Sequence, residues 1–237
     1  MSAAALARLP VDPSAGLVDL GTIARPAPLG AQASEMLRNA LRRGTLRPGQ
    51  RLTTRDVAAT LSISPTPARE AITRLVAEGV LDLGPDRTAV VPVLTRARYD
   101  ELFLIRSELE ALAGRLACGR VEADRLARLE AIYDTHAAAI RAEDGSGALA
   151  ANATFHATLY AACGLPTLIQ MIDSLWLQVG PSLNLLFSGS TQAPWIGATT
   201  HRAMIRAIRN GDAEAMGAAI RQDLDEGRAR LLPLLPA

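Results

Sequence analysis

Residues 46–81 read LRPGQRLTTRDVAATLSISPTPAREAITRLVAEGVL, and two short helical patterns lie in them on either side of LSIS. We expect Thr54 to cap the first helix and Ser64 to cap the second, because their side-chain oxygens can accept a hydrogen bond from a free amide of the first turn. The prolines after Ser64 fall in the first turn, where a missing amide donor costs little. Two helices joined in this way predict a helix-turn-helix.

The sequence on either side completes a small domain. Apolar positions such as Leu37 and Leu41 predict a first helix that begins at Ala31 and ends near Gly44. Downstream, VLDLGPDRTAVVPVL shows two β-rich runs around a Gly-Pro-Asp turn, which is typical of a hairpin. Residues 28–95 therefore predict a winged helix-turn-helix, and residues 1–27 predict a flexible N-terminal arm.

Beyond Thr95 the strand signals vanish and helical patterns follow, broken near Glu143, Gly164, Gly180 and Asn210. Aromatic residues make up only 3% of the 237-residue chain, so the core must be aliphatic, which favours packed helices. Residues 96–237 are predicted to form an all-α antiparallel helical bundle. The predicted fold class is mainly α, with a small β-hairpin wing in the N-terminal domain.

Charge and cysteine content restrict the class of protein. The net charge is +1, but residues 26–95 carry nine arginines and six acids, which favours a nucleic-acid surface in the N-terminal half. Cys118 and Cys163 lie far apart and form no metal or disulfide motif. The sequence shows neither an export signal nor a run of about 18 apolar residues. We therefore expect a cytoplasmic protein that does not enter a membrane.

The predicted second helix of the helix-turn-helix carries the candidate DNA-reading residues. In this motif the start of the second helix enters the major groove, which places Ser64, Thr66 and Arg69 at the bases of double-stranded operator DNA. Arg55 is expected to face phosphates, and Arg87 at the wing tip to enter the minor groove or hold the backbone. Each arginine taken alone is equally well explained as a solvated surface charge.

Residues 46–81 resemble the DNA-binding domain of the GntR family of regulators. The resemblance rests on the PG-x-x-L turn, the S-x-T-P-x-R-E start of the second helix and the L-x-x-x-G-x-L run into the wing. It implies a DNA-binding transcription regulator, with repression as the default, and not an enzyme. Pro65 stands where the family usually has a DNA-contacting arginine, so the resemblance does not predict which operator sequence this chain binds.

Four polar side chains fall on otherwise apolar helix faces in the C-terminal half: Asn152, His156, His201 and Asp223. Burying an unpaired polar group costs roughly 2–7 kcal/mol, so such side chains converge on each other, water, a metal or a ligand. Two imidazoles and a carboxylate suit a divalent ion such as zinc, nickel or manganese. A hydrogen-bonded cluster without metal remains open, and His136 is expected to be structural.

The strings FHATLYAACG and HRAMIRAIRNGDAEAM resemble the FCD ligand-binding domain of the FadR subfamily of GntR regulators. Metal-binding members of that domain use an Asp four residues before a first His, and two further histidines. His156 and His201 match this pattern. Asn152 stands in place of the Asp and Asp223 in place of the last His, so the implied ligand set is Asn, His, His and Asp.

An effector site is expected in the same bundle. Arg106 shares a face with apolar residues, so its guanidinium could meet the carboxylate of a small organic-acid effector; an i,i+4 pair with Glu110 would satisfy it equally well. Tyr160, Trp176 and Asn184 are candidates to line the same pocket.

These features predict a homodimer that holds paired recognition helices on a pseudo-palindromic operator, controlled by a small organic acid. Three alternatives stay open. In the first, the regulator responds to the metal ion itself. In the second, the bundle is a metal-dependent hydrolase, although no activated nucleophile, HExxH or phosphate loop is present. In the third, the chain is an interaction module whose polar pocket is vestigial.

Overall fold

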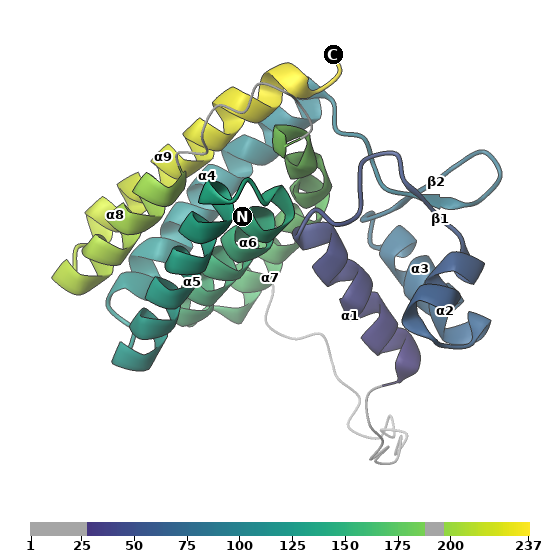
Figure 1. Cartoon of the computed structure of the whole chain (residues 1–237), viewed down its shortest axis with the longest axis horizontal. Helices are drawn as coiled ribbons and strands as arrows, with labels where there is room; N and C mark the ends of the chain where they lie inside the picture. Colours follow the sequence, from purple (N-terminus) through teal and green to yellow (C-terminus); the bar gives the residue numbers. More distant parts are fainter. Residues whose placement is uncertain (1–27, 188–196) are drawn as a thin grey trace, which may run out of the picture.

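The computed structural model describes residues 28–187 and 197–237. The arm predicted over residues 1–27 lies outside them. The chain is mainly helical, with a winged helix-turn-helix and a helical bundle side by side (Figure 1). This arrangement confirms the predicted fold class.

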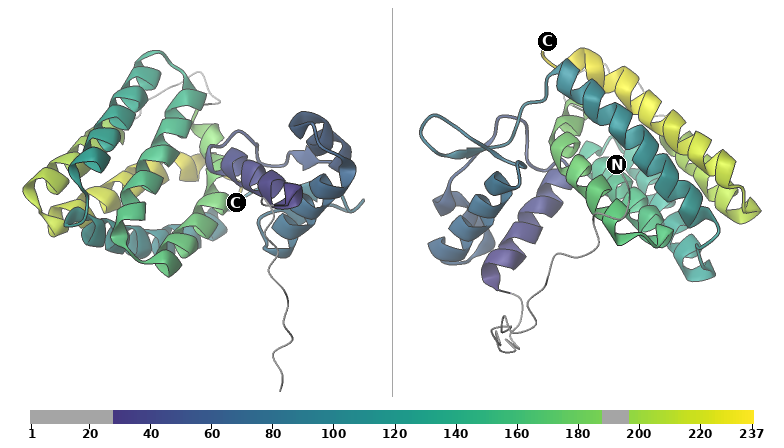
Figure 2. Two further views of the ribbon diagram at one scale, coloured as in Figure 1. Left: turned by 90° about the horizontal axis from the view of Figure 1, so that it is seen from below. Right: turned by 180° about the vertical axis from the view of Figure 1, so that it is seen from behind.

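The helices of the N-terminal domain are α1 (Leu29–Arg42), α2 (Thr54–Leu61) and α3 (Pro65–Ala77). α1 therefore begins two residues earlier than predicted. It lies between the helix-turn-helix and the bundle (Figures 1 and 2) and packs against both α3 and α7 (Pro166–Val179). This position makes α1 the element through which the two parts of the chain meet.

The caps of the two short helices differ in detail from the prediction. Thr53, and not Thr54, caps α2, because the Thr53 hydroxyl accepts the amide hydrogen of Asp56 at 3.1 Å. Ser64 does occupy the cap position of α3, but its side chain makes no capping bond. The third helical residue is Pro67, which has no amide hydrogen to donate, so one of the two usual capping donors is missing.

The wing is a small antiparallel sheet. Its strands are β1 (Arg51–Leu52), β2 (Asp82–Leu83) and β3 (Ala89–Val90), in the order β1-β3-β2. In the register, Leu52 of β1 and Leu83 of β2 both face Ala89. The hairpin was predicted, whereas its shortness and the third strand were not. The domain core beneath it is aliphatic, with Leu41, Leu75 and Leu81 fully buried.

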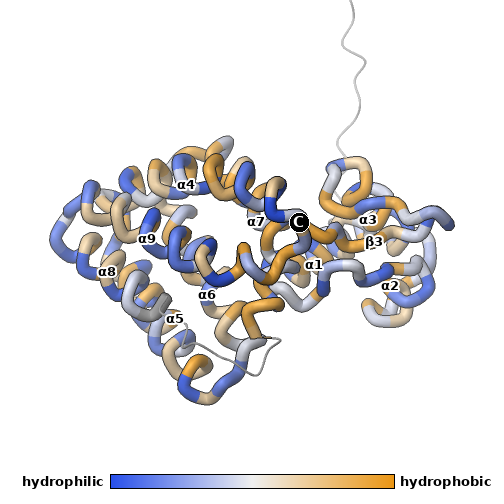
Figure 3. The backbone as a smooth tube through the Cα atoms, turned by 90° about the horizontal axis from the view of Figure 1, so that it is seen from above, coloured by the Kyte–Doolittle hydropathy of each residue, from blue (hydrophilic) through white to orange (hydrophobic). Residues whose placement is uncertain are grey.

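The bundle contains α4 (Arg96–Cys118), α5 (Ala123–Arg141), α6 (Gly145–Tyr160), α7, α8 (Gly197–Asn210) and α9 (Ala213–Leu231), with 3-10 segments at Ala161–Cys163, Gly180–Phe187 and Leu232–Leu234. Hydrophobic and hydrophilic stretches alternate along these helices (Figure 3), as expected when each helix buries one face. None of the helices in the described ranges is both long and apolar enough to span a bilayer.

The two parts of the chain pack closely at the junction of α1 with α7. Leu177 of α7 is buried in the core of the N-terminal domain. Gly180 lies so near the end of α1 that a Cβ atom there would collide with the carbonyl oxygen of Leu41. Arg42 of α1 donates to both carboxylate oxygens of Asp173 on α7, one of them at 2.7 Å. The bundle and the N-terminal domain are therefore joined by apolar packing and by an ion pair.

Candidate functional site

The predicted DNA-reading residues lie together on the helix-turn-helix and wing. Ser64, Thr66 and Arg69 are exposed at the start of α3, Arg55 is exposed at the start of α2, and Arg87 is exposed in the hairpin turn. Within the part of the chain that the structure describes, none of the three arginines has an ion-pair partner. The leading edge of α3 is thus open to solvent, as docking in a groove requires.

Local contacts hold the wing tip in shape. Asp86 accepts the backbone amide hydrogen of Thr88 at 3.2 Å and forms an ion pair with Arg51 of β1. The Thr88 amide first, and then Arg51, lower the pKa of the Asp86 carboxyl. Arg87 adopts a left-handed conformation, with φ of 61°. The contacts of Asp86 with Thr88 and Arg51 therefore hold in place the turn that carries the Arg87 side chain.

The bundle brings three of the predicted metal ligands into one buried cluster. His156 on α6, His201 on α8 and Asp223 on α9 offer ligand atoms that all lie within 4.8 Å of one another. The Nε2 atoms of the two histidines are 3.2 Å apart, and Asp223 lies 3.2 Å from His156 Nε2 and 3.8 Å from His201 Nε2. The consecutive helices α8 and α9 thus converge on one point with α6, which lies well upstream in the sequence.

These spacings fit a divalent ion. With metal–nitrogen distances of 2.0–2.1 Å, neighbouring ligand atoms lie about 3.3 Å apart in a tetrahedral site and about 3.0 Å apart in an octahedral site. Two of the three observed separations fall at 3.2 Å. Asn152 lies one turn before His156, and its Oδ1 atom is buried without a hydrogen-bond partner in the described ranges. An unpaired buried oxygen at this position suits a fourth ligand.

A hydrogen-bonded chain behind His156 favours one tautomer. Glu110 of α4 is fully buried and accepts the hydroxyl hydrogen of Tyr160 at 2.8 Å. The Tyr160 oxygen, 3.0 Å from His156 Nδ1, is then left to accept a hydrogen from that nitrogen. With Nδ1 as the donor to Tyr160, the Nε2 atom of His156 meets Asp223 at 3.2 Å either through a proton on Nε2 or through a cation between the two atoms.

The electrostatics of the cluster keep His201 and Asp223 in the forms that bind a metal. Burial lowers the pKa of His201 well below its ordinary value, so its imidazole is neutral at pH 7. Burial alone would raise the pKa of Asp223, but the hydrogen bond with His156, the two imidazoles and the Thr200 hydroxyl outweigh it and lower that pKa. A negative charge beside a neutral imidazole attracts a divalent cation.

Two other predicted residues have different surroundings from those of the cluster. Arg106 is buried, donates to Glu110 at 2.6 Å and lies over the Trp176 ring at 4.9 Å, so the i,i+4 pair with Glu110 is present. Asn184 lies in the 3-10 segment after α7, where its amide donates to the carbonyl of Gly44. It belongs to the junction between the domains and does not line the bundle pocket.

Tyr160 and Trp176 do border a small cavity of about 80 Å³ between α6 and α7. The outer wall of this cavity is formed by Arg42 and Asp173, the ion pair that joins the domains. Neither residue was predicted as part of a site. Because 131 positions separate them, no periodicity or local motif could have paired them.

Comparison with known proteins gives the family. The sequence profile of bacterial regulatory proteins of the gntR family matches residues 29–91, and the profile of the FCD domain matches residues 101–226. The chain belongs to the GntR family. It is a DNA-binding transcription regulator with a C-terminal FCD domain, and its relatives are regulators and not enzymes.

Curated GntR relatives agree with this assignment. The HTH-type transcriptional regulator McbR of Escherichia coli K12 is 33% identical over 165 residues, which cover 70% of this chain and 75% of McbR. The HTH-type transcriptional repressor RspR of the same organism is 22% identical over 199 residues, covering 84% and 87% of the two chains.

Solved structures of GntR regulators share the fold. The structure of E. coli McbR/YncC superposes with a TM-score of 0.83 at 28% identity, covering 88% of this chain and 99% of the other. A GntR transcriptional regulator from Rhodococcus sp. RHA1 superposes with a TM-score of 0.70 at 24% identity, covering 86% and 97%. The second likeness is one of fold alone.

Proposed function

We propose that this GntR regulator binds a pseudo-palindromic operator as a homodimer, and that a small organic acid beside a divalent metal ion in the bundle controls this binding. His156, His201 and Asp223 would hold the metal, with Asn152 as a further oxygen ligand. The observation that carries the proposal is the convergence of His156, His201 and Asp223, whose ligand atoms all lie within 4.8 Å of one another in a buried part of the bundle.

The donor set restricts the metal. Two imidazole nitrogens with oxygen donors suit borderline ions such as zinc, nickel or manganese, and the absence of sulfur ligands disfavours softer ions. The Tyr160 hydroxyl supports the site by orienting His156, as the outer partners of metal-bound histidines commonly do. When bound, the ion would supply open positions that a carboxylate of the effector can fill.

α7 offers a physical route from the metal cluster to the DNA-binding domain. The Trp176 ring lies 5.4 Å from that of His156, and the next residue, Leu177, is buried in the core of the DNA-binding domain. One turn earlier, Asp173 pairs with Arg42 of α1. A ligand that moves α7 by a small amount therefore shifts α1 and the helix-turn-helix with it.

Exposed apolar residues on α4 support the homodimer. Leu104 has 67% of its surface exposed and Ile105 has 42%, and Leu112 is exposed two turns further along the same helix. Large apolar side chains gathered on one helix face mark an interaction surface. The partner that best explains this face is a second copy of the chain, because an operator with two half-sites needs two helix-turn-helix units.

The five exposed residues of the helix-turn-helix and wing are proposed to make two kinds of contact with DNA. Arg69, with Ser64 and Thr66, would read bases in the major groove, and Arg55 and Arg87 would bind the backbone. Arg69→Ala should then lose discrimination among operators, by about 1–3 kcal/mol at the base pair it reads. Arg87→Ala should weaken binding to all duplexes alike and flatten the dependence on salt.

A regulator that answers to the metal ion alone is the second candidate. Arg106 already has Glu110 as its carboxylate partner, and the cavity beside Tyr160 holds only about 80 Å³, which is small for an organic ligand. In both versions the name of the relative RspR supports repression, in which ligand binding releases the operator.

Operator binding with and without zinc tests the proposal. A duplex selected from random DNA would be titrated by fluorescence anisotropy against the metal-free chain, the zinc-loaded chain, and each with a panel of small carboxylic acids. An affinity that changes only when zinc and an acid are both present supports the organic-acid version, and a change with zinc alone supports the metal version. An affinity that responds to neither overturns both.

A further inference from the structure

A second cavity, separate from the metal cluster, lies between the DNA-binding domain and the bundle. It has a volume of about 600 Å³ and opens to solvent between the end of α1, the start of α5 and the middle of α6. This volume is in the range of sites that hold small ligands, and it is too small to admit duplex DNA. We call it the interdomain cleft.

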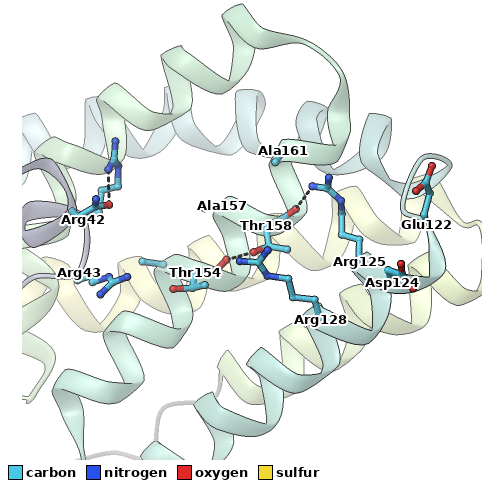
Figure 4. Close-up of a pocket in the computed structure, with 12 residues that line it drawn as sticks. Arg42, Arg43, Glu122, Asp124, Arg125, Arg128, Thr154, Ala157, Thr158 and Ala161 are labelled. Carbon is cyan, nitrogen blue, oxygen red and sulfur yellow. Dashed lines mark hydrogen bonds between the residues drawn. The ribbon is translucent and has the colours of Figure 1, made fainter. Parts of the chain in front are cut away.

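Arginines from both domains line the interdomain cleft. Arg42 and Arg43 come from the end of α1, and Arg125 and Arg128 come from α5. Figure 4 shows Arg125 and Arg128 reaching toward Thr154 and Thr158 of α6, while Arg43 approaches the same stretch of α6 from the opposite side. Positively charged side chains from two domains thus lie together in the cleft, beside α6.

Most of this charge has no acidic partner among the described residues. Arg42 is neutralised by Asp173 and Glu35. Neither Arg43, Arg125 nor Arg128 has a carboxylate oxygen within 4.0 Å in the described ranges, although Arg125 donates to the carbonyl of Thr158 at 3.2 Å. Converging guanidinium groups repel each other unless an anion lies between them.

The remaining lining residues suit a small ligand. Ala153 and Ala157 of α6, with Ala161 just after its end, line the cleft with methyl groups, and Thr154 and Thr158 line it beside them. Two acids, Glu122 and Asp124, also line the cleft, but Figure 4 places them at the end away from Arg43. The positive part of the cleft is therefore the part where the two domains meet.

We propose that the interdomain cleft binds a small anion with two or more negative charges, such as a phosphate monoester or a dicarboxylate, between Arg43 of the DNA-binding domain and Arg125 and Arg128 of the bundle. Guanidinium groups bind such anions through paired, charge-assisted hydrogen bonds. An anion held from both sides ties α1 to α5 and α6. The site therefore regulates how the DNA-binding domain sits on the bundle, independently of the metal cluster.

Calorimetric titration of the full chain tests this site without DNA present. Glycerol 3-phosphate and succinate are the two charged probes, and glycerol is the neutral control. We expect one of the charged probes to bind at one site per chain and glycerol not to bind. Arg43→Gln and Arg128→Gln should each weaken binding by about tenfold or more, as loss of a charged hydrogen bond does.

Matched variants separate this site from others. Arg141→Gln removes the same charge from an exposed position at the end of α5 and should leave probe binding unchanged. Asp223→Asn alters the metal cluster and should also leave it unchanged, so failure of the metal proposal is visible separately. Binding that survives Arg43→Gln and Arg128→Gln, or that disappears in Asp223→Asn or in the DNA-reading variant Arg69→Ala, would overturn the proposal.

Discussion

Replacing Tyr160 with Phe removes one oxygen atom and tests how the metal cluster is built. The Tyr160 hydroxyl lies 2.8 Å from Glu110 and 3.0 Å from His156, and all three side chains are buried. Tyr160→Phe leaves a carboxylate oxygen and an imidazole nitrogen without partners. Since each unsatisfied buried group costs about 1–3 kcal/mol, we expect the loss of two partners to lower the free energy of unfolding of the metal-free protein by about 2–6 kcal/mol.

The same change should weaken metal binding. Without the Tyr160 oxygen, His156 loses the contact that fixes its tautomer, and loss of such an outer partner lowers metal affinity about 10–100-fold. Zinc affinity is measured by competition with a chelating indicator, and stability by urea denaturation.

Tyr133→Phe is the matched control, because the Tyr133 hydroxyl accepts hydrogen bonds from Arg202 on the exposed surface of the bundle. It should change stability by less than about 0.5 kcal/mol and leave zinc affinity unaltered. If Tyr160→Phe behaves like Tyr133→Phe in both assays, the account of the cluster is refuted.

Three further predictions concern acid stability, coupling and assembly. Burial lowers the pKa of His136 to about 4, so below pH 6.5 the imidazole becomes protonated in the unfolded chain but stays neutral in the folded chain. The free energy of unfolding should therefore fall by up to about 3 kcal/mol between pH 6.5 and 4. In urea titrations, His136→Leu should make this dependence on pH flatter. Asp173→Asn breaks the contact with Arg42 and should reduce the response of operator affinity to bundle ligands, whereas Glu101→Gln, at an exposed ion pair of α4, should not. In sedimentation velocity, Leu104→Glu should convert the proposed dimer to a monomer, and a dimer that this variant leaves unchanged would exclude that face.

The DNA-binding domain was largely readable from the sequence because its signals are local. The TTRD start of α2, the prolines of α3 and the Gly-Pro-Asp turn act over a few residues, so each element could be placed in turn. The errors are local too. Thr53 and Thr54 are adjacent and chemically alike, and only the helix backbone decides which of them can reach the amide of Asp56.

Helical periodicity predicted part of the candidate metal site. It indicated that His156, His201 and Asp223 face inward, but that they meet at one point depends on how α6, α8 and α9 pack. Asn184 lies in a 3-10 segment, where α-helical spacing no longer predicts the direction of a side chain, so its hydrogen bond to Gly44 could not be predicted. The long-range pair of Arg42 with Asp173 left no trace in the sequence at all.

The metal content of the purified chain tests the central claim most directly. Protein would be loaded with zinc, nickel or manganese, dialysed, and measured by inductively coupled plasma mass spectrometry beside His156→Ala and His201→Ala. We predict close to one ion per chain for at least one metal in the natural sequence, and a large loss in both variants. A chain that retains none of the three metals, or variants that retain as much as the natural sequence, would contradict the account.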